Sequence, residues 1–198
     1  MMTSIRIKEV ALSQFARNGY EGASLADIAS KVGIKKQSIY THFKGKEELF
    51  LEVLRDVAAM ELQFVTNYFD SHLSVSVDEL LYRFLLQYQE RYEQQDTTRF
   101  FLRNLFFPPA HLENEVAQSG NHYVESIEEL LLPVFDKARA DKSVDPSISS
   151  QRATAAYTAL LDGMFVEMLF GGHARLMKRM DASWYIYWRG IKMEELSL

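Results

Sequence analysis

Apolar residues recur along the chain at intervals of three and four, the spacing that places them on one face of an α-helix. Alternation of apolar and polar residues over the length of a strand is almost absent. The pattern predicts an all-α protein of about nine helices. The expected helices cover residues 5–18, 25–32, 36–43, 46–69, 76–92, 97–106, 115–139, 149–170 and 181–192.

Several expected helix ends carry their own local signals. Ser76 with Glu79 three residues later is a capping box, in which each side chain accepts the backbone N–H of the other residue. Gly171-Gly172 ends the strongly apolar helix over 149–170. Pro133 falls inside another expected helix and predicts a kink there.

Residues 24–41 have the pattern of a helix-turn-helix. Ser24 is a good N-cap for the first helix, and Gly33 can take the left-handed conformation that turns the chain into the second. Ile34 and Ile39 supply the apolar side of that second helix. Its outward side chains are of the types that bind base edges and phosphates, namely Lys35, Lys36, Gln37, Ser38, Tyr40 and Thr41.

Charge is distributed unevenly along the 198 residues, whose net charge is −5. Residues 1–50 carry eight Lys and Arg against five Asp and Glu, net +3, which leaves net −8 for the remainder. This asymmetry suggests that only the N-terminal quarter meets a polyanion. The first residues lack the apolar core of a signal peptide, and no uncharged apolar run approaches the roughly 18 residues of a membrane span. A cytoplasmic protein is therefore expected.

Motifs for catalysis or metal binding are missing from the sequence. The absence of cysteine excludes disulfides, thiolate zinc sites and a cysteine nucleophile. The five histidines show no metal-ligand spacing, and there is no Gly-rich phosphate loop. We expect no metal, no cofactor and no enzymatic activity.

The N-terminal motif extends beyond the helix-turn-helix. Its residues include Phe15, Gly19-Tyr20, Ile28-Ala29, Gly33 and the ending Tyr40-x-His42-Phe43-x-x-Lys46-Glu47-x-Leu49. Over residues 5–50 this string resembles the DNA-binding domain of the TetR family of bacterial transcriptional regulators. The rest of the chain is similar to that family only in its length and helical character.

The resemblance implies a homodimer that binds a palindromic operator, usually as a repressor, and is released by a small molecule. By position, Lys36, Gln37, Ser38 and Thr41 would face the major groove. Tyr40, His42 and Lys46 would contact phosphates, and Ser24 would cap its helix beside the DNA backbone. Lys35 departs from the family, which often has a small hydroxyl residue there, so this helix either starts less tightly or gains a phosphate contact.

Aromatic residues are abundant in the larger part of the chain and mostly serve as core. Buried tyrosines need hydrogen-bond partners, which together with the resemblance suggests an aromatic-lined effector pocket. Glu61 falls on an apolar stripe, where it either reaches water at the edge or accepts from a cationic or hydrogen-bonding ligand. Glu167 raises the same question. The candidate pocket residues are Glu61, Phe64, Tyr68, Tyr88, Phe101, Tyr123 and Phe165, and the expected ligand is flat, apolar and aromatic or cationic.

Residues 184–188, Trp-Tyr-Ile-Tyr-Trp, place large side chains all around the last expected helix. A terminal helix of a small domain cannot bury every side against its own core, so one face is expected to contact a partner. The stripe of Trp184, Trp188 and Ile191 is the predicted dimer interface. The resemblance implies that the last two helices of each subunit pair as a four-helix bundle.

We therefore expect a DNA-binding domain over 1–46 and an effector-binding and dimerisation domain over 47–198. Two other classes of protein remain open from the sequence. One is a helical small-molecule-binding or enzymatic protein whose N-terminal hairpin serves only for packing. The other is a DNA-binding dimer that has no effector.

Overall fold

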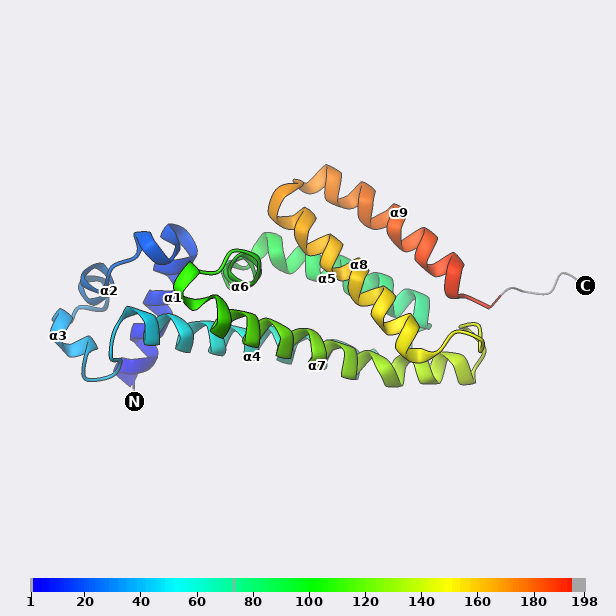
Figure 1. The fold of residues 1–198 in the computed structure, drawn as a ribbon, viewed down its shortest axis with the longest axis horizontal. Helices are drawn as coiled ribbons and strands as arrows, with labels where there is room; N and C mark the ends of the chain where they lie inside the picture. The colour runs from blue at the N-terminus through cyan, green and yellow to red at the C-terminus, as the bar shows by residue number, and fades with distance from the viewer. Residues whose placement is uncertain (1, 73, 194–198) are drawn as a thin grey trace, which may run out of the picture. The chain divides into compact units, whose positions relative to one another are not determined.

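The computed structural model describes residues 2–72 and 74–193 (Figure 1), and within them every regular element is helical. The all-α prediction is confirmed for these residues. The elements are α1 (Met2–Gly22), α2 (Leu25–Val32), α3 (Lys36–Ile39), α4 (Lys46–Ser71), α5 (Val77–Gln94), α6 (Asp96–Phe106), the 3-10 helix η1 (Ala110–Leu112), α7 (Glu113–Ala140), α8 (Ser150–Phe170) and α9 (His173–Ile191).

Two predicted helix bounds were wrong. The helical backbone of α1 breaks at Gly19 (φ 70°, ψ 175°), where the predicted helix stops, and a second helical segment continues to Gly22. α3 ends at Ile39, four residues early, and turns follow it. α9 begins at His173, eight residues before the predicted start, because its first turns bury Leu176 and Met180. Half of residues 173–180 are polar or charged, so the sequence did not indicate that one side of this segment is apolar and buried.

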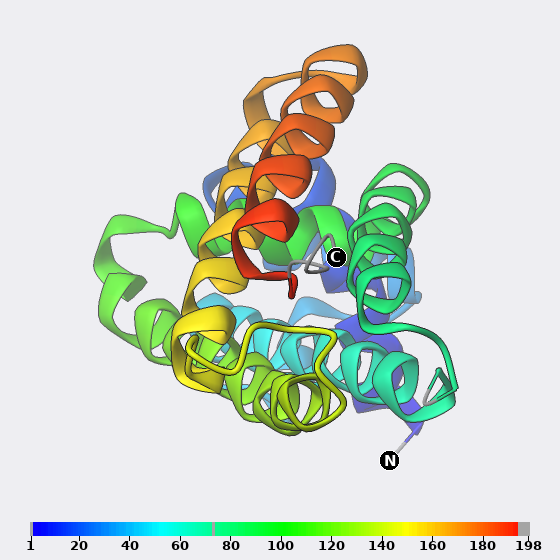
Figure 2. The same ribbon diagram turned by 90° about the vertical axis from the view of Figure 1, so that its right-hand side faces the viewer.

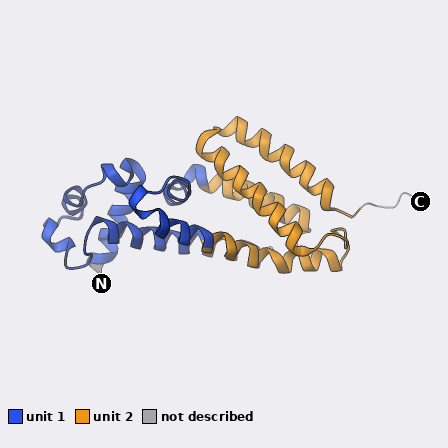
Figure 3. Ribbon diagram, viewed as in Figure 1, with its two compact units in different colours: residues 1–61, 92–121 blue, residues 62–91, 122–198 orange. Residues whose placement is uncertain are grey.

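The chain divides into two compact units, coloured separately in Figure 3. Unit 1 comprises residues 1–61 and 92–121, and unit 2 comprises residues 62–91 and 122–198. Unit 1 is therefore larger than the DNA-binding domain expected over residues 1–46. That boundary concerns function rather than packing, and it stays a prediction.

The core of unit 1 joins the N-terminal helices to α6. α1 packs against α2 and α6, and α2 packs against α3. The rings of Phe15 and Phe50 meet edge to face at 5.2 Å, and Phe100 of α6 lies 5.9 Å from Phe50. Lys8 of α1 forms an ion pair with Asp56 of α4 at 2.5 Å. Aromatic packing thus holds the helices that carry the motif.

The core of unit 2 is built around α8, which runs antiparallel to α9 in Figures 1 and 2. Two tyrosines are buried there and donate hydrogen bonds to backbone carbonyls, Tyr157 to Leu81 at 2.7 Å and Tyr68 to Leu80 at 2.7 Å. Burial raises the pKa of Tyr68 to about 12. These phenols are satisfied by the fold itself.

Among the described residues, α8 is long and apolar enough to cross a membrane by length and composition. Half of the apolar stretch that passes this test is buried inside the fold. A core helix passes the same test, and Tyr157 and Leu161 show that α8 supplies the core of unit 2.

Candidate nucleic-acid interface and ligand cavity

α2 is closed at both ends by residues that the sequence singled out. The hydroxyl of Ser24 accepts from the Asp27 backbone N–H at 3.1 Å and donates to the Asp27 carboxylate at 2.6 Å. Ile28 and Ala29 are buried on its inner face. The predicted capping of α2 by Ser24 is confirmed. Because its hydroxyl bonds to Asp27, the hydroxyl is engaged within the protein.

Gly33 makes the turn between α2 and α3. Its φ is 83° and its ψ is 29°, in the left-handed region that favours glycine. The backbone N–H groups of Gly33 and Ile34 both donate to the carbonyl of Ala29 at 3.0 Å. These bonds close the end of α2 and direct the chain into α3.

α3 buries one residue, Ile39, and turns its polar side chains outward. The exposed residues of this region are Lys35, Lys36, Gln37, Tyr40, Thr41 and His42, whereas Ser38 is half-buried. Lys35 occupies the N-cap position without a side-chain hydrogen bond, and the Thr41 hydroxyl donates to the Ser38 carbonyl at 2.7 Å. The face thus offers amide, hydroxyl and ammonium groups to solvent.

Lys46 differs from the other candidate DNA contacts because it is engaged inside unit 1. Its ammonium donates to the Ala23 carbonyl at 3.2 Å and lies 4.2 Å from the centre of the Tyr20 ring. The Tyr20 hydroxyl in turn lies 3.2 Å from Nε2 of His111. Lys46 therefore has a structural role, and its phosphate contact stays a prediction.

The predicted effector residues are divided between the units. Glu61 and Phe101 belong to unit 1, and the other five belong to unit 2. Within unit 2, the Tyr88 and Tyr123 hydroxyls share a hydrogen bond of 2.8 Å, and Phe165 lies 4.8 Å from the Tyr88 ring. Phe64 lies 6.0 Å from the same ring. Four of the candidates therefore meet as a packed aromatic cluster, and their role as ligand contacts remains untested.

Glu61 is fully buried, with 0% of its surface exposed, so its placement at a solvated stripe edge was wrong. The Thr98 hydroxyl donates to its carboxylate at 2.9 Å. Glu167 is also buried, and its carboxylate forms ion pairs with Arg175, at 2.7 Å, and Arg179. The Arg175 hydrogen bond holds the pKa of Glu167 below its usual value, against the opposing effect of burial.

The residues chosen for the dimer interface lie against their own unit. The Trp184 ring contacts Tyr82 at 5.6 Å and stacks on Trp188 at 5.7 Å. Ile191 is 6% exposed and belongs to the core of its own chain, which removes it as a partner contact. Trp184 and Trp188 are half-buried and stay predicted partner contacts, and α9 also exposes Tyr185 and Ile186, which the sequence reasoning did not select.

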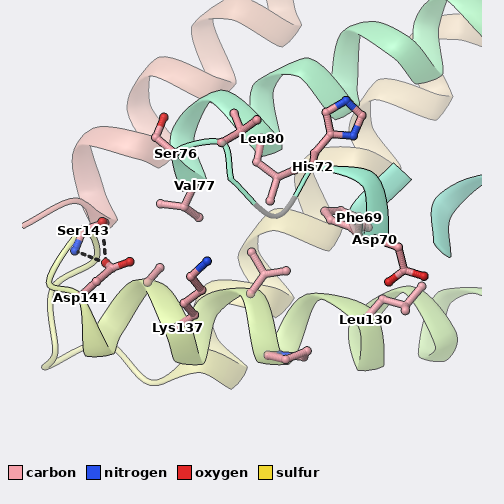
Figure 4. Close-up of a pocket in the computed structure, with 14 residues that line it drawn as sticks. Phe69, Asp70, His72, Ser76, Val77, Leu80, Leu130, Lys137, Asp141 and Ser143 are labelled. Atoms are coloured by element: carbon pink, nitrogen blue, oxygen red, sulfur yellow. Dashed lines mark hydrogen bonds between the residues drawn. The ribbon is translucent and has the colours of Figure 1, made fainter. Parts of the chain in front are cut away.

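Unit 2 contains a cavity of about 400 Å³ that the sequence reasoning missed (Figure 4). It lies between the end of α4, the start of α5 and the C-terminal half of α7, and none of the predicted effector residues lines it. Its apolar walls include Val75 and Val77, which alternate with serines before and inside the start of α5. The alternation of serine and valine over residues 74–77 was the sequence feature that could have indicated this cavity. Within the described residues no group of His, Asp or Glu is placed to hold a metal ion.

Together the fold and the motif define an all-α protein with an N-terminal helix-turn-helix. Residues 7–53 match the model of the bacterial regulatory proteins of the tetR family. IcaR of Staphylococcus epidermidis, the negative transcriptional regulator of the biofilm operon icaADBC, is 31% identical over 88 residues. That alignment covers 44% of this chain and 48% of IcaR, so the chain spans about half the length of the curated relatives it matches.

Solved structures of similar fold cover nearly the whole chain. A TetR-family regulator from Cytophaga hutchinsonii has a TM-score of 0.77 at 18% identity, over 98% of this chain and 96% of that one. FadR from Bacillus subtilis in complex with stearoyl-CoA has a TM-score of 0.70 at 14% identity, over 94% and 98% of the two chains. Identities this low show the fold alone. The match at residues 7–53 confirms that the N-terminal part of the chain resembles the bacterial regulatory proteins of the tetR family.

Proposed function

We propose that the protein is a DNA-binding transcriptional regulator of the cytoplasm. The observation that carries this proposal is the exposed polar face of α3. The turn at Gly33 and the burial of Ile39 orient this face toward solvent. Side chains such as Gln37 and Lys36 bond to base edges in the major groove, and residues such as Tyr40 and His42 contact phosphates. Residues 1–46 form the DNA-binding domain in this proposal, and residues 47–198 form the regulatory and dimerisation domain.

The regulator acts as a repressor on a palindromic operator. Support for repression comes from IcaR, which is described as a negative transcriptional regulator. Support for a homodimer comes from α8 and α9, whose exposed surfaces include Val166, Tyr185 and Ile186. Exposed apolar side chains on adjacent helices are typical of a subunit interface.

A small molecule bound in the regulatory domain releases the DNA. Two recognition helices must meet half-sites about one helical turn apart, ~34 Å, for a dimer to bind both. A ligand that prefers a conformation with another spacing shifts the population away from DNA. FadR of B. subtilis has been solved with stearoyl-CoA, which supports a ligand-binding role for this fold.

Selection of bound duplexes from a random pool tests the proposal. The expected winners have two-fold symmetry and half-sites one turn apart. Gln37→Ala should relax the preference at particular base pairs by roughly 1–3 kcal/mol if its contact is bidentate. Gln63→Ala, which changes an exposed glutamine of α4 outside the motif, is the matched control and should leave the selected site unchanged.

Two results would contradict the proposal. The absence of DNA binding even at low salt would favour a helical protein whose N-terminal hairpin only packs. Winning sequences without two-fold symmetry would remove the palindromic operator while leaving DNA binding intact.

A further inference from the structure

The cavity at the junction of α4, α5 and α7 has the size and lining of a small-molecule site. Its volume of about 400 Å³ falls in the range of ligand pockets, roughly 300–1,000 Å³. It lies entirely within unit 2. Its walls are mainly apolar, formed by Phe69, Val75, Val77, Leu80, Leu130 and Val134.

Four of these apolar side chains remain partly open to water. Val75, Val77, Leu130 and Val134 are each half-buried. An apolar ligand that covered them would remove this surface from water at a gain proportional to its area. The walls therefore favour a ligand with an apolar body.

The charges around the cavity favour a cation. Asp70 and Asp141 line it, and Figure 4 shows them near its opposite ends. Asp141 accepts from the hydroxyl of Ser143 at 2.6 Å and from its backbone N–H at 3.0 Å. These bonds hold the pKa of Asp141 below its usual value, so its carboxylate is ionised at neutral pH.

Helix ends add to the negative potential at the cavity. α4 ends at Ser71 and α7 ends at Ala140, so both present their partially negative C-terminal ends to this region, whereas α5 begins at Val77 and presents its partially positive N-terminal end. Lys137 is the single lysine or arginine among the described lining residues. His72 points away from α7 in Figure 4, and its ring Nδ1 lies 2.8 Å from the Tyr68 carbonyl. Two carboxylates and two helix C-termini therefore outweigh one ammonium and one helix N-terminus.

We propose that this cavity binds a small molecule with an apolar body and one cationic head group. The body covers Phe69 and the open valines, and the head group lies beside the Asp70 carboxylate. The site is separate from the aromatic cluster around Tyr88. Its regulatory consequence, release of DNA, rests on the proposed function, whereas binding itself does not.

Isothermal titration calorimetry with three probes of equal chain length tests the charge preference. Decyltrimethylammonium is the cation, decanoate the anion and decanol the neutral molecule, the two ions below their micelle concentrations and decanol below its solubility limit. We expect the cation to bind most tightly. Asp70→Asn should weaken its binding roughly twofold to fivefold, the range for an exposed ion pair, and leave decanol unchanged. Glu129→Gln, an exposed carboxylate of α7 outside the cavity, is the matched control.

Filling the cavity tests the location. Val134→Phe should weaken all three probes, and methyl NMR signals of Val75, Val77 and Leu130 should shift on titration of the unmodified protein. Circular dichroism verifies the fold of the variant, and Val77→Phe replaces it if Val134→Phe does not fold. The proposal would be overturned if the folded cavity-filling variant bound the probes as tightly as the unmodified protein does. It would also be overturned if decanoate bound more tightly than the cation.

The site and the proposed function fail in different ways. If the protein binds no DNA but Val134→Phe abolishes probe binding, the site stands and the regulatory role falls. If decyltrimethylammonium releases selected DNA equally well from Val134→Phe, the regulator stands and this cavity is not its ligand site.

Discussion

Gly33 shows how much a single residue contributes to the candidate interface. Its left-handed φ of 83° orients α3 against α2, and nothing lies within 4 Å of the position that a Cβ would take. The requirement for glycine is therefore conformational rather than steric.

We predict that Gly33→Ala destabilises the protein by about 1–2 kcal/mol, the cost of left-handed backbone for a residue with a Cβ. Urea denaturation measures this change, and DNA affinity should fall with it. Gly190→Ala is the control, because Gly190 lies in helical backbone of α9 with open space around it. Alanine there should be neutral or slightly stabilising. Equal effects of the two substitutions would contradict the argument.

Glu167 gives a prediction for pH dependence. The hydrogen bond from Arg175 is the main cause that holds its pKa below the usual 4.5, and Arg179 adds to it. A group whose folded pKa is lowered contributes stability above its unfolded pKa and loses it as the pH falls through the folded value. Acidification below about pH 4.5 should therefore remove this contribution.

Urea unfolding of Glu167→Gln across that pH range is the measurement. The stability difference between the unmodified protein and this variant should be largest at neutral pH and should shrink below about pH 4.5. Glu129→Gln serves as the control for a general effect of removing one carboxylate. A difference that stays constant with pH would show that the ion pairs with Arg175 and Arg179 contribute nothing.

At the scale of elements, the start of α4 is tied to the turn before α2. Lys46, the first residue of α4, binds the Ala23 carbonyl and the Tyr20 ring. Sequence position alone suggested a phosphate contact. The structure adds a second role, which changes how a substitution at Lys46 must be interpreted.

We predict that Lys46→Met lowers the free energy of unfolding by about 1–2 kcal/mol, since a charge-assisted hydrogen bond is lost. Lys44→Met, which changes an exposed lysine two residues earlier, should leave stability unchanged. If Lys46 also contacts DNA, its variant should weaken binding to all sequences alike and reduce the salt dependence. Unchanged stability of Lys46→Met would remove the structural role.

For the whole molecule, the main prediction concerns self-association. Ile186 is 69% exposed and Tyr185 is 56% exposed, and Ile186, two residues after Trp184, lies on nearly the opposite side of α9. Ile186→Glu should place a charge in the proposed subunit seam and give folded monomers. Met60→Glu, at an exposed apolar residue of unit 1, is the control and should leave the dimer intact.

Sedimentation velocity with circular dichroism distinguishes the two faces of α9. Trp184→Glu should unfold unit 2, because the Trp184 ring packs against Tyr82 and Tyr157. An unchanged dimer for Ile186→Glu, with monomers for Trp184→Glu that remain folded, would support the interface of Trp184 and Trp188 that the sequence predicts.

The sequence by itself determined the helical fold, most helix bounds, the Ser24 cap and the Gly33 turn. Each depends on residues within one or two turns of one another, where periodicity and capping preferences act. Local patterns did not predict the early end of α3 or the early start of α9. The turns after Ile39 and the burial of Leu176 depend on packing between helices.

Only the tertiary structure decided which side of α9 is buried, that Glu61 meets Thr98, and that a cavity lies beside Val77 and Val134. Each of these joins residues that are distant in the sequence. Helical spacing shows that a face is apolar but not what covers it, because several partners satisfy the same pattern. Burial, pairing and cavities arise only when the helices are packed together.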